Sequence, residues 1–166
     1  MFGIGDKIVY PLHGAGFVEA IEEKEILGKK KKYYVMRTFS GNMTVLIPMD
    51  NYEEIGVRAV IDAAEAKKVM EYFKNEPLYD DNNWNRRQRD NMDKIKSGNI
   101  YKVLDVLKDL MYRERKKGLS TSERKVLGNA RQIIISELVM SNFAEQDDIE
   151  LMLDTIVDNL LSASEV

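Results

Sequence analysis

Hydrophobic and polar residues follow two different periods along the chain, and the change falls near residue 60. Before it, short apolar and aromatic runs occur at intervals of roughly ten residues and are separated by glycine, proline and other turn residues. These runs occupy residues 7–10, 17–22, 32–37 and 43–47. Such a series of short strands is typical of a small antiparallel barrel or a strongly curved sheet.

After residue 60, apolar side chains recur every three or four positions, as they do on one face of a helix. Helices are expected over residues 59–74, 84–95 and 145–161, and two more are expected after Asn99 and Ser120. Asn99 is a predicted N-cap, Gly118 is a predicted helix-terminating residue, and Ser120 with Glu123 fits a capping box. The polar run over residues 80–83 is expected to link two of these helices.

The chain is therefore predicted to be α+β, with a β module over residues 1–56 followed by an all-α helical bundle over residues 60–166. The total length of 166 residues allows one medium domain or two small ones. A β module of about 55 residues is close to the minimum for independent folding, so we expect it to depend on its neighbour.

Composition argues against enzymatic chemistry. The chain has no cysteine and one histidine, His13, which leaves little for thiolate, metal or Ser-His-Asp sites. The glycines after His13 lack the Lys-Ser/Thr of a phosphate loop, so a tight β turn is expected there. Adjacent carboxylates, such as Glu53 and Glu54, are expected to be solvated. We expect no enzyme activity, cofactor, metal or small-molecule substrate. Without a membrane span or a signal sequence, a cytoplasmic, nucleoid-associated protein is expected.

Charge is distributed very unevenly along the sequence. The chain has a net charge of −3, but residues 82–131 have a net charge of +8 and residues 132–166 have a net charge of −8. Electrostatic fields that attract polyanions act over about a Debye length, so the local basic block is more informative than the total. The basic block favours a nucleic-acid partner.

The most unusual segment of the basic block is Asn83-Trp84-Asn85-Arg86-Arg87-Gln88-Arg89. Trp84 is the only tryptophan, and it begins a predicted helix with almost no apolar neighbours. One interpretation is a tryptophan packed at the domain junction beside a solvated basic face. The other is a nucleic-acid site, in which arginines contact phosphates or a narrow minor groove and the aromatic ring wedges against an unstacked base. The lysines at 29–32 have two similar interpretations, a phosphate contact or a solvated turn.

Several motifs occur in one order along the chain, and together they resemble the CarD/CdnL family of bacterial transcription regulators. They are Val9-Tyr10-Pro11 with His13-Gly14, Asn83-Trp84-Asn85-Arg86-Arg87, Ser97-Gly98-Asn99, Arg113-Glu114 through Ser120, and Ala130-Arg131-Gln132-Ile133. The resemblance covers about residues 2–140. It implies that the first domain is a Tudor-like β-barrel module that interacts with RNA polymerase and that the second is a helical DNA-binding domain.

The resemblance also implies partners and roles for particular residues. The partners would be the RNA polymerase β subunit and promoter DNA, double-stranded or forked, at the upstream edge of the melted bubble. Trp84 would be a minor-groove wedge, and its DNA-contacting companions would be Arg86, Arg87, Arg89, Arg124 and Lys125. The polymerase contacts would be Lys24, Ile26 and Leu46, although some relatives have arginine at the position of Leu46. Residues 142–166 have no firm counterpart in the motif pattern.

Two other functions remain open at this stage. The chain could be a protein-interaction adaptor whose basic block binds an acidic protein or its own acidic tail. It could instead be an RNA-binding regulator, because small β barrels also bind RNA. Salt-dependent binding to duplex DNA distinguishes a promoter regulator from a protein-interaction adaptor. Competition between forked DNA and structured RNA distinguishes it from an RNA-binding regulator.

Overall fold

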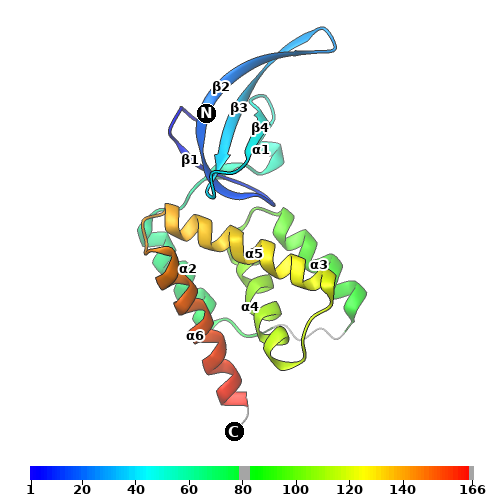
Figure 1. Ribbon diagram of the computed structural model, residues 1–166, viewed down its shortest axis with the longest axis vertical. Coiled ribbons are helices and arrows are strands. Elements are labelled where there is room, and N and C mark those ends of the chain that lie inside the picture. Colours follow the sequence, from blue (N-terminus) through cyan, green and yellow to red (C-terminus); the bar gives the residue numbers. More distant parts are fainter. Residues whose placement is uncertain (79–82, 165–166) are drawn as a thin grey trace.

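The computed structural model describes residues 1–78 and 83–164, in which a β module and a helical module are stacked end to end (Figure 1). This arrangement confirms the predicted α+β fold, with strands first and helices after them. The predicted link over residues 80–82 lies outside the described residues. In the described part of the chain, no helix is long and apolar enough to cross a bilayer.

The β module is a five-stranded antiparallel sheet. Its strands are β1 (Lys7–Tyr10), β2 (Gly14–Ile26), β3 (Lys29–Thr38), β4 (Thr44–Pro48) and β5 (Arg58–Ala59), and the short helix α1 (Tyr52–Ile55) precedes β5. The strand order is β4-β3-β2-β1-β5, so hydrogen bonding leaves β4 and β5 as edges and does not close a barrel. One face of the sheet encloses a small core of Ile8, Val18, Tyr34, Met36, Ile47 and Val57.

Strands β2 and β3 form a hairpin that is longer than the sequence pattern predicts. The lysines at 29–32 belong to β3 and are not a turn, because the turn consists of Leu27 and Gly28 alone. Both turn residues have positive φ, at 54° and 78°, as a two-residue turn between twisted strands requires. The hairpin extends beyond β4 as a two-stranded ribbon that projects from the module (Figure 1).

The helical module consists of α2 (Ala63–Asn75), α3 (Trp84–Lys96), α4 (Ile100–Lys116), α5 (Thr121–Met140) and α6 (Gln146–Ser164). The predicted helix over 59–74 begins later than expected. Arg58 and Ala59 instead pair with β1, and Asp62 caps α2 by accepting a hydrogen bond from Glu65 N. The predicted N-caps are confirmed at Asn99 and Ser120. Apolar side chains of α2, α4, α5 and α6, with Ile95 of α3, form one continuous core.

An ion pair between the half-buried Arg58 and a fully buried carboxylate joins the two modules. Glu137 of α5 is fully buried, and it accepts hydrogen bonds from Arg58 Nη1 at 2.6 Å, from Arg58 Nη2 at 2.7 Å and from Ile61 N at 3.0 Å. Arg58 Nε also donates to Gly98 O at 2.8 Å, at the C-terminal end of α3. A paired, multiply hydrogen-bonded carboxylate has a defined geometry, so this junction sets how the modules are oriented.

Close backbone packing reinforces the junction where β2 meets α5. Ala15 N donates to Ser136 Oγ at 3.0 Å, and Gln132 Nε2 donates to His13 O at 3.2 Å. Gly14 has φ of +83°, and a Cβ there would lie 2.8 Å from Ser136 Oγ. The turn expected at the glycines after His13 lies one step earlier, over residues 11–13, because Gly14 already begins β2, where it packs against α5.

Candidate nucleic-acid interface

Trp84 is exposed at the first position of α3. Asn83 caps the helix by accepting a hydrogen bond from Arg86 N at 3.1 Å, and Trp84 is 44% exposed. The opposite end of α3, near Gly98, contacts Arg58 at the module junction. A 13-residue helix is about 20 Å long, so Trp84 lies well away from that junction. The interpretation of Trp84 as a packed junction residue is therefore wrong.

Arg87 is not exposed beside Trp84. Its side chain is 7% exposed, and it donates from Nε to Glu123 Oε2 at 3.0 Å and from Nη2 to Glu123 Oε1 at 3.1 Å. Glu123 of α5 is also buried, with 3% exposed. The expectation that Arg87 contacts DNA is corrected, because a guanidinium buried against a carboxylate presents no free face to a phosphate.

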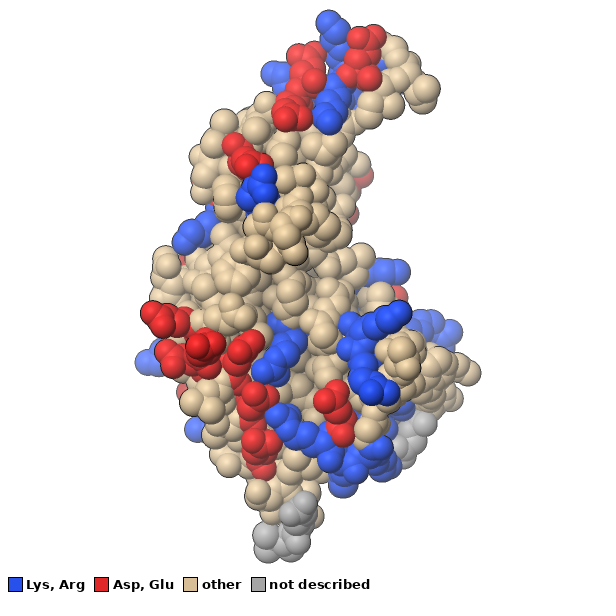
Figure 2. All heavy atoms as spheres, in the orientation of Figure 1, with Lys and Arg blue, Asp and Glu red and all other residues tan. Residues whose placement is uncertain are grey.

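The Arg87–Glu123 pair brings together two groups of basic residues from distant parts of the sequence. Arg86 and Arg89 are exposed on α3, and because they are three residues apart they lie on the same side of the helix. Arg124 and Lys125 are exposed on the first turns of α5, directly after Glu123. Figure 2 shows Lys and Arg side chains gathered over this side of the helical module. We call Trp84 and these four basic residues the basic face.

The charge state of Glu123 favours its pairing with Arg87. Burial raises the pKa of the Glu123 carboxyl, but the hydrogen bonds and charge of Arg87 outweigh burial, with smaller contributions from Arg113 and Ser120. The net result is a pKa below the ordinary value, so Glu123 is ionised at neutral pH. The buried pair is therefore an ion pair in the physiological range.

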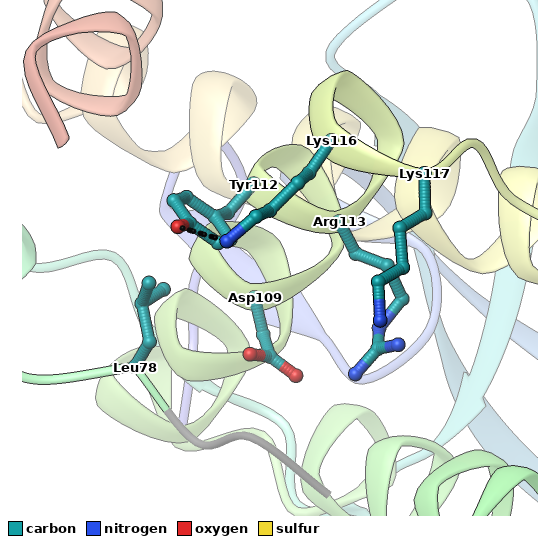
Figure 3. Close-up of a pocket in the computed structure, with 6 residues that line it drawn as sticks. All are labelled: Leu78, Asp109, Tyr112, Arg113, Lys116 and Lys117. Carbon is teal, nitrogen blue, oxygen red and sulfur yellow. Dashed lines mark hydrogen bonds between the residues drawn. The ribbon is translucent and has the colours of Figure 1, made fainter. Parts of the chain in front are cut away.

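A small basic cleft lies beside α4, near the basic face. Its lining consists of Leu78, Asp109, Tyr112, Arg113, Lys116 and Lys117 (Figure 3). Lys116 Nζ donates to the Tyr112 hydroxyl at 3.2 Å and lies 5.3 Å from the centre of its ring. The cleft has a volume of about 180 Å³, which is below the 300–1,000 Å³ typical of small-molecule sites. Lysines around so small a hollow suit contact with a polyanion better than enclosure of a substrate.

The acidic helix α6 neutralises part of the positive surface. Asp154 accepts hydrogen bonds from Arg115 Nη2 at 2.8 Å and from Arg131 Nη2 at 3.3 Å, and Asp158 pairs with Arg115 at 3.1 Å. Burial raises the pKa of Asp154, but these arginines outweigh it and lower the pKa overall. Arg131 belongs to the basic block of the sequence, but its pairing with Asp154 offsets its charge. Acidic side chains run along α6 in Figure 2.

The three predicted polymerase contacts share one face of the sheet. Directly paired residues on neighbouring strands have side chains on the same face, and alternate residues along a strand do too. The cross-strand pairs are Lys24 with Lys31, Ile26 with Lys29, and Leu46 with Val35. The core residues Tyr34 and Met36 occupy even positions of β3, and the partners of the three contacts occupy odd positions. All three contacts therefore lie on the face opposite the core. We call this the outer face.

The outer face is spread out along the hairpin. Val35 pairs with Ala20 as well as with Leu46, so Leu46 lies at the level of Ala20. Lys24 is four residues farther along β2, a separation of about 13 Å. Ile26 is 53% exposed and Leu46 is 41% exposed, so this face presents apolar surface to solvent. Lys24 is exposed and lies 3.9 Å from Glu22.

Sequence reasoning missed two residues that shape these surfaces. Glu123 was assigned only to a capping box, and Ser120 Oγ does accept from Glu123 N at 3.2 Å, but the Glu123 carboxylate pairs with Arg87. Leu27 is 98% exposed with positive φ, an unusual state for a bulky residue. Its position before Gly28, between two strand-forming runs, was the available signal.

Comparisons with known proteins agree with this two-module organisation. The family model described as the CarD-like/TRCF RID domain matches residues 2–61, and the model described as CarD, C-terminal domain, matches residues 68–154. The second match includes the first half of α6, so residues 142–154 do have a counterpart in the family. The Bacillus subtilis (strain 168) protein named "Putative transcription factor YdeB" is 46% identical over 138 residues, covering 83% of this chain and 90% of that protein.

Proposed function

Because this chain belongs to the CarD family of transcription regulators, we propose that it docks on the β subunit of bacterial RNA polymerase and stabilises the open promoter complex. In this proposal the helical module contacts double-stranded or forked DNA at the upstream edge of the transcription bubble. The protein works by binding alone and is associated with the nucleoid through polymerase and DNA.

The observation on which the proposal chiefly rests is the exposure of Trp84 at a helix end within the basic face. An indole that is 44% exposed, next to Arg86 and Arg89 and near Arg124 and Lys125, combines an aromatic surface with cations. Arginine and lysine neutralise phosphates, while an aromatic ring stacks on an unpaired base. A DNA fork offers both partners at one place.

The wedge supplies a physical reason for open-complex stabilisation. A factor shifts an equilibrium between closed and open promoter only if it binds the open state better. Phosphate contacts exist in both states, so the basic residues bind both. The stacking partner of Trp84 exists only after a base step has opened, so its binding energy favours the open state.

The outer face is the proposed polymerase contact. Ile26 and Leu46 expose apolar surface on it, Lys24 adds a charge, and β4 leaves a sheet edge beside Leu46. Docking through this face raises the local concentration of the basic face at the promoter, so weak intrinsic DNA affinity is sufficient. The buried Arg58–Glu137 junction keeps the distance between the two faces fixed.

Binding to an isolated β-subunit fragment tests the docking role. Ile26→Glu places a charge on the outer face and is expected to weaken binding at least about tenfold, a loss of about 1.4 kcal/mol. Leu151→Glu is the matched control, because Leu151 is 66% exposed on α6, outside the β module. Equal binding of both variants and the unaltered protein would show that the outer face is not the docking site.

An RNA-binding regulator is the second candidate, because the basic face would also attract RNA phosphates. Competition at one salt concentration distinguishes the two. Forked promoter DNA is expected to displace structured RNA from the protein, and the reverse order of affinity would favour the RNA-binding alternative.

A further inference from the structure

Helix α3 is attached to the bundle in an unusual way along the half that contains Trp84. The helix is described over its whole length, and its buried side chains are Arg87, Asn91 and Ile95. Ile95 lies in the last turn, so the first two turns of the described helix bury no apolar side chain. Hydrophobic packing therefore anchors the C-terminal end of α3, and polar contacts hold the end with the tryptophan.

Arg87 is a buried polar anchor of that end. It follows Trp84 by three residues, and residues three apart lie on the same side of a helix. Its two bonds to Glu123 measure 3.0 and 3.1 Å, and the two side chains are 7% and 3% exposed. Glu123 directly precedes Arg124 and Lys125, so the Arg87–Glu123 pair connects the two halves of the basic face.

We infer that the Arg87–Glu123 pair is a positioning element, which sets the orientation of Trp84 and its distance from Arg124 and Lys125. The inference rests on the proposed function, in which Trp84 is the wedge. A two-pronged guanidinium–carboxylate pair fixes both distance and angle, whereas apolar packing tolerates sliding and rotation. Arg87 thus acts on DNA through Trp84 and not by touching a phosphate.

Two variants can change the orientation of Trp84 without a large change in the stability of the fold. Replacing a buried ion pair by apolar residues of similar volume is often neutral for stability, whereas removing one partner leaves an unpaired buried charge. The double variant Arg87→Met/Glu123→Leu therefore keeps the fold while it removes the fixed geometry. Arg87→Lys is a second variant, because lysine keeps the charge but cannot form the two-pronged pair.

The test uses the full chain with polymerase and promoter DNA, and it has three readouts. They are the half-life of the open complex, the salt dependence of duplex binding, and the fluorescence anisotropy of Trp84, the sole tryptophan of this chain, measured on the protein without polymerase. We expect the double variant to keep its melting temperature within about 3 °C. It should shorten the open-complex half-life about tenfold and lower the Trp84 anisotropy, with an unchanged salt slope. Arg87→Lys should shift the half-life and the anisotropy in the same direction.

The charge swap Arg87→Glu/Glu123→Arg provides the rescue. It restores the pair in reverse, so positioning predicts a half-life within about twofold of the unaltered protein. If Arg87 instead contacts a phosphate, the charge swap should not restore the half-life, and Arg87→Met/Glu123→Leu should have a salt slope lower by about one. Those two results would overturn the inference. Unchanged anisotropy in both the double variant and Arg87→Lys would overturn it too. If Trp84→Ala itself leaves the half-life unchanged, the proposed function fails, and anisotropy alone then decides whether the pair positions Trp84.

Discussion

The module junction offers a sharp test, because Arg58→Ala would leave Glu137 as a fully buried carboxylate without its cation. Glu137 accepts two bonds from Arg58, at 2.6 and 2.7 Å, and its third bond comes from the Ile61 backbone. The substitution also removes the bond from Arg58 Nε to Gly98 O. The variant would therefore lose the side-chain hydrogen bonds that connect β5 to α5 and to the end of α3.

The expected cost follows from burial. Removing one partner of a buried pair costs about 3–5 kcal/mol. The Arg58 side chain is 31% exposed, so water can approach its site, and we expect the lower end, about 3 kcal/mol. For a chain of this length, each kcal/mol lowers the melting temperature by about 2–4 °C, which predicts a shift of about 6–12 °C.

Urea denaturation followed by circular dichroism measures this loss. The matched control is Arg37→Ala, which breaks the Arg37–Glu19 pair at 2.9 Å on the exposed surface of the β module. Surface pairs contribute at most about 1 kcal/mol, so the control should unfold close to the unaltered protein. If Arg58→Ala costs no more than Arg37→Ala, the reasoning about the buried junction is refuted.

Three further predictions concern α6, the hairpin turn and acid stability. Leu153 of α6 is fully buried, so Leu153→Ala should cost about 2–5 kcal/mol in urea unfolding; a neutral variant would mean that α6 is a dispensable tail. Leu27→Asn should stabilise the chain by up to about 1 kcal/mol, because asparagine tolerates positive φ; a loss of stability would show that Leu27 packs favourably. The pKa values of Glu123 and Asp154 lie below their ordinary values of 4.5 and 3.8, so the stability that these pairs contribute is complete at neutral pH. This contribution to the free energy of unfolding should be lost as the pH falls below 4.5 and 3.8. A Glu123→Gln variant that loses as much stability in acid as the unaltered protein would contradict this.

Local signals in the sequence were sufficient for most helix boundaries. Asn99 and Ser120 cap helices through bonds within their own first turns, and Gly118, with φ of +81°, follows the end of α4. These structures depend on nearby residues, so the sequence pattern contains the necessary information. By contrast, the two-residue strand at 58–59 has no period of its own and forms only because β1 provides a partner.

The candidate site was only partly predictable for the same reason. Trp84 and Arg86 were identified from residue type and spacing, and both are exposed. Arg87 looked equivalent to Arg86 because a run of arginines does not reveal which one meets a carboxylate 36 residues away. Arg131 is counted in the basic block, but its pairing with Asp154 depends on how α6 packs. Charge counts predict an overall field, whereas tertiary contacts decide which charges remain available.

The half-life of the open promoter complex, measured with Trp84→Ala, tests the proposed mechanism most directly. Stacking on a base contributes about 1–3 kcal/mol, so the variant should shorten the half-life by one to two decades at most. Trp84→Phe, which keeps an aromatic face, should retain part of the effect. Binding to the β-subunit fragment should be unchanged for both variants, because the outer face lies on the other module. A Trp84→Ala protein that docks normally and sustains an open complex of undiminished half-life would contradict the wedge mechanism.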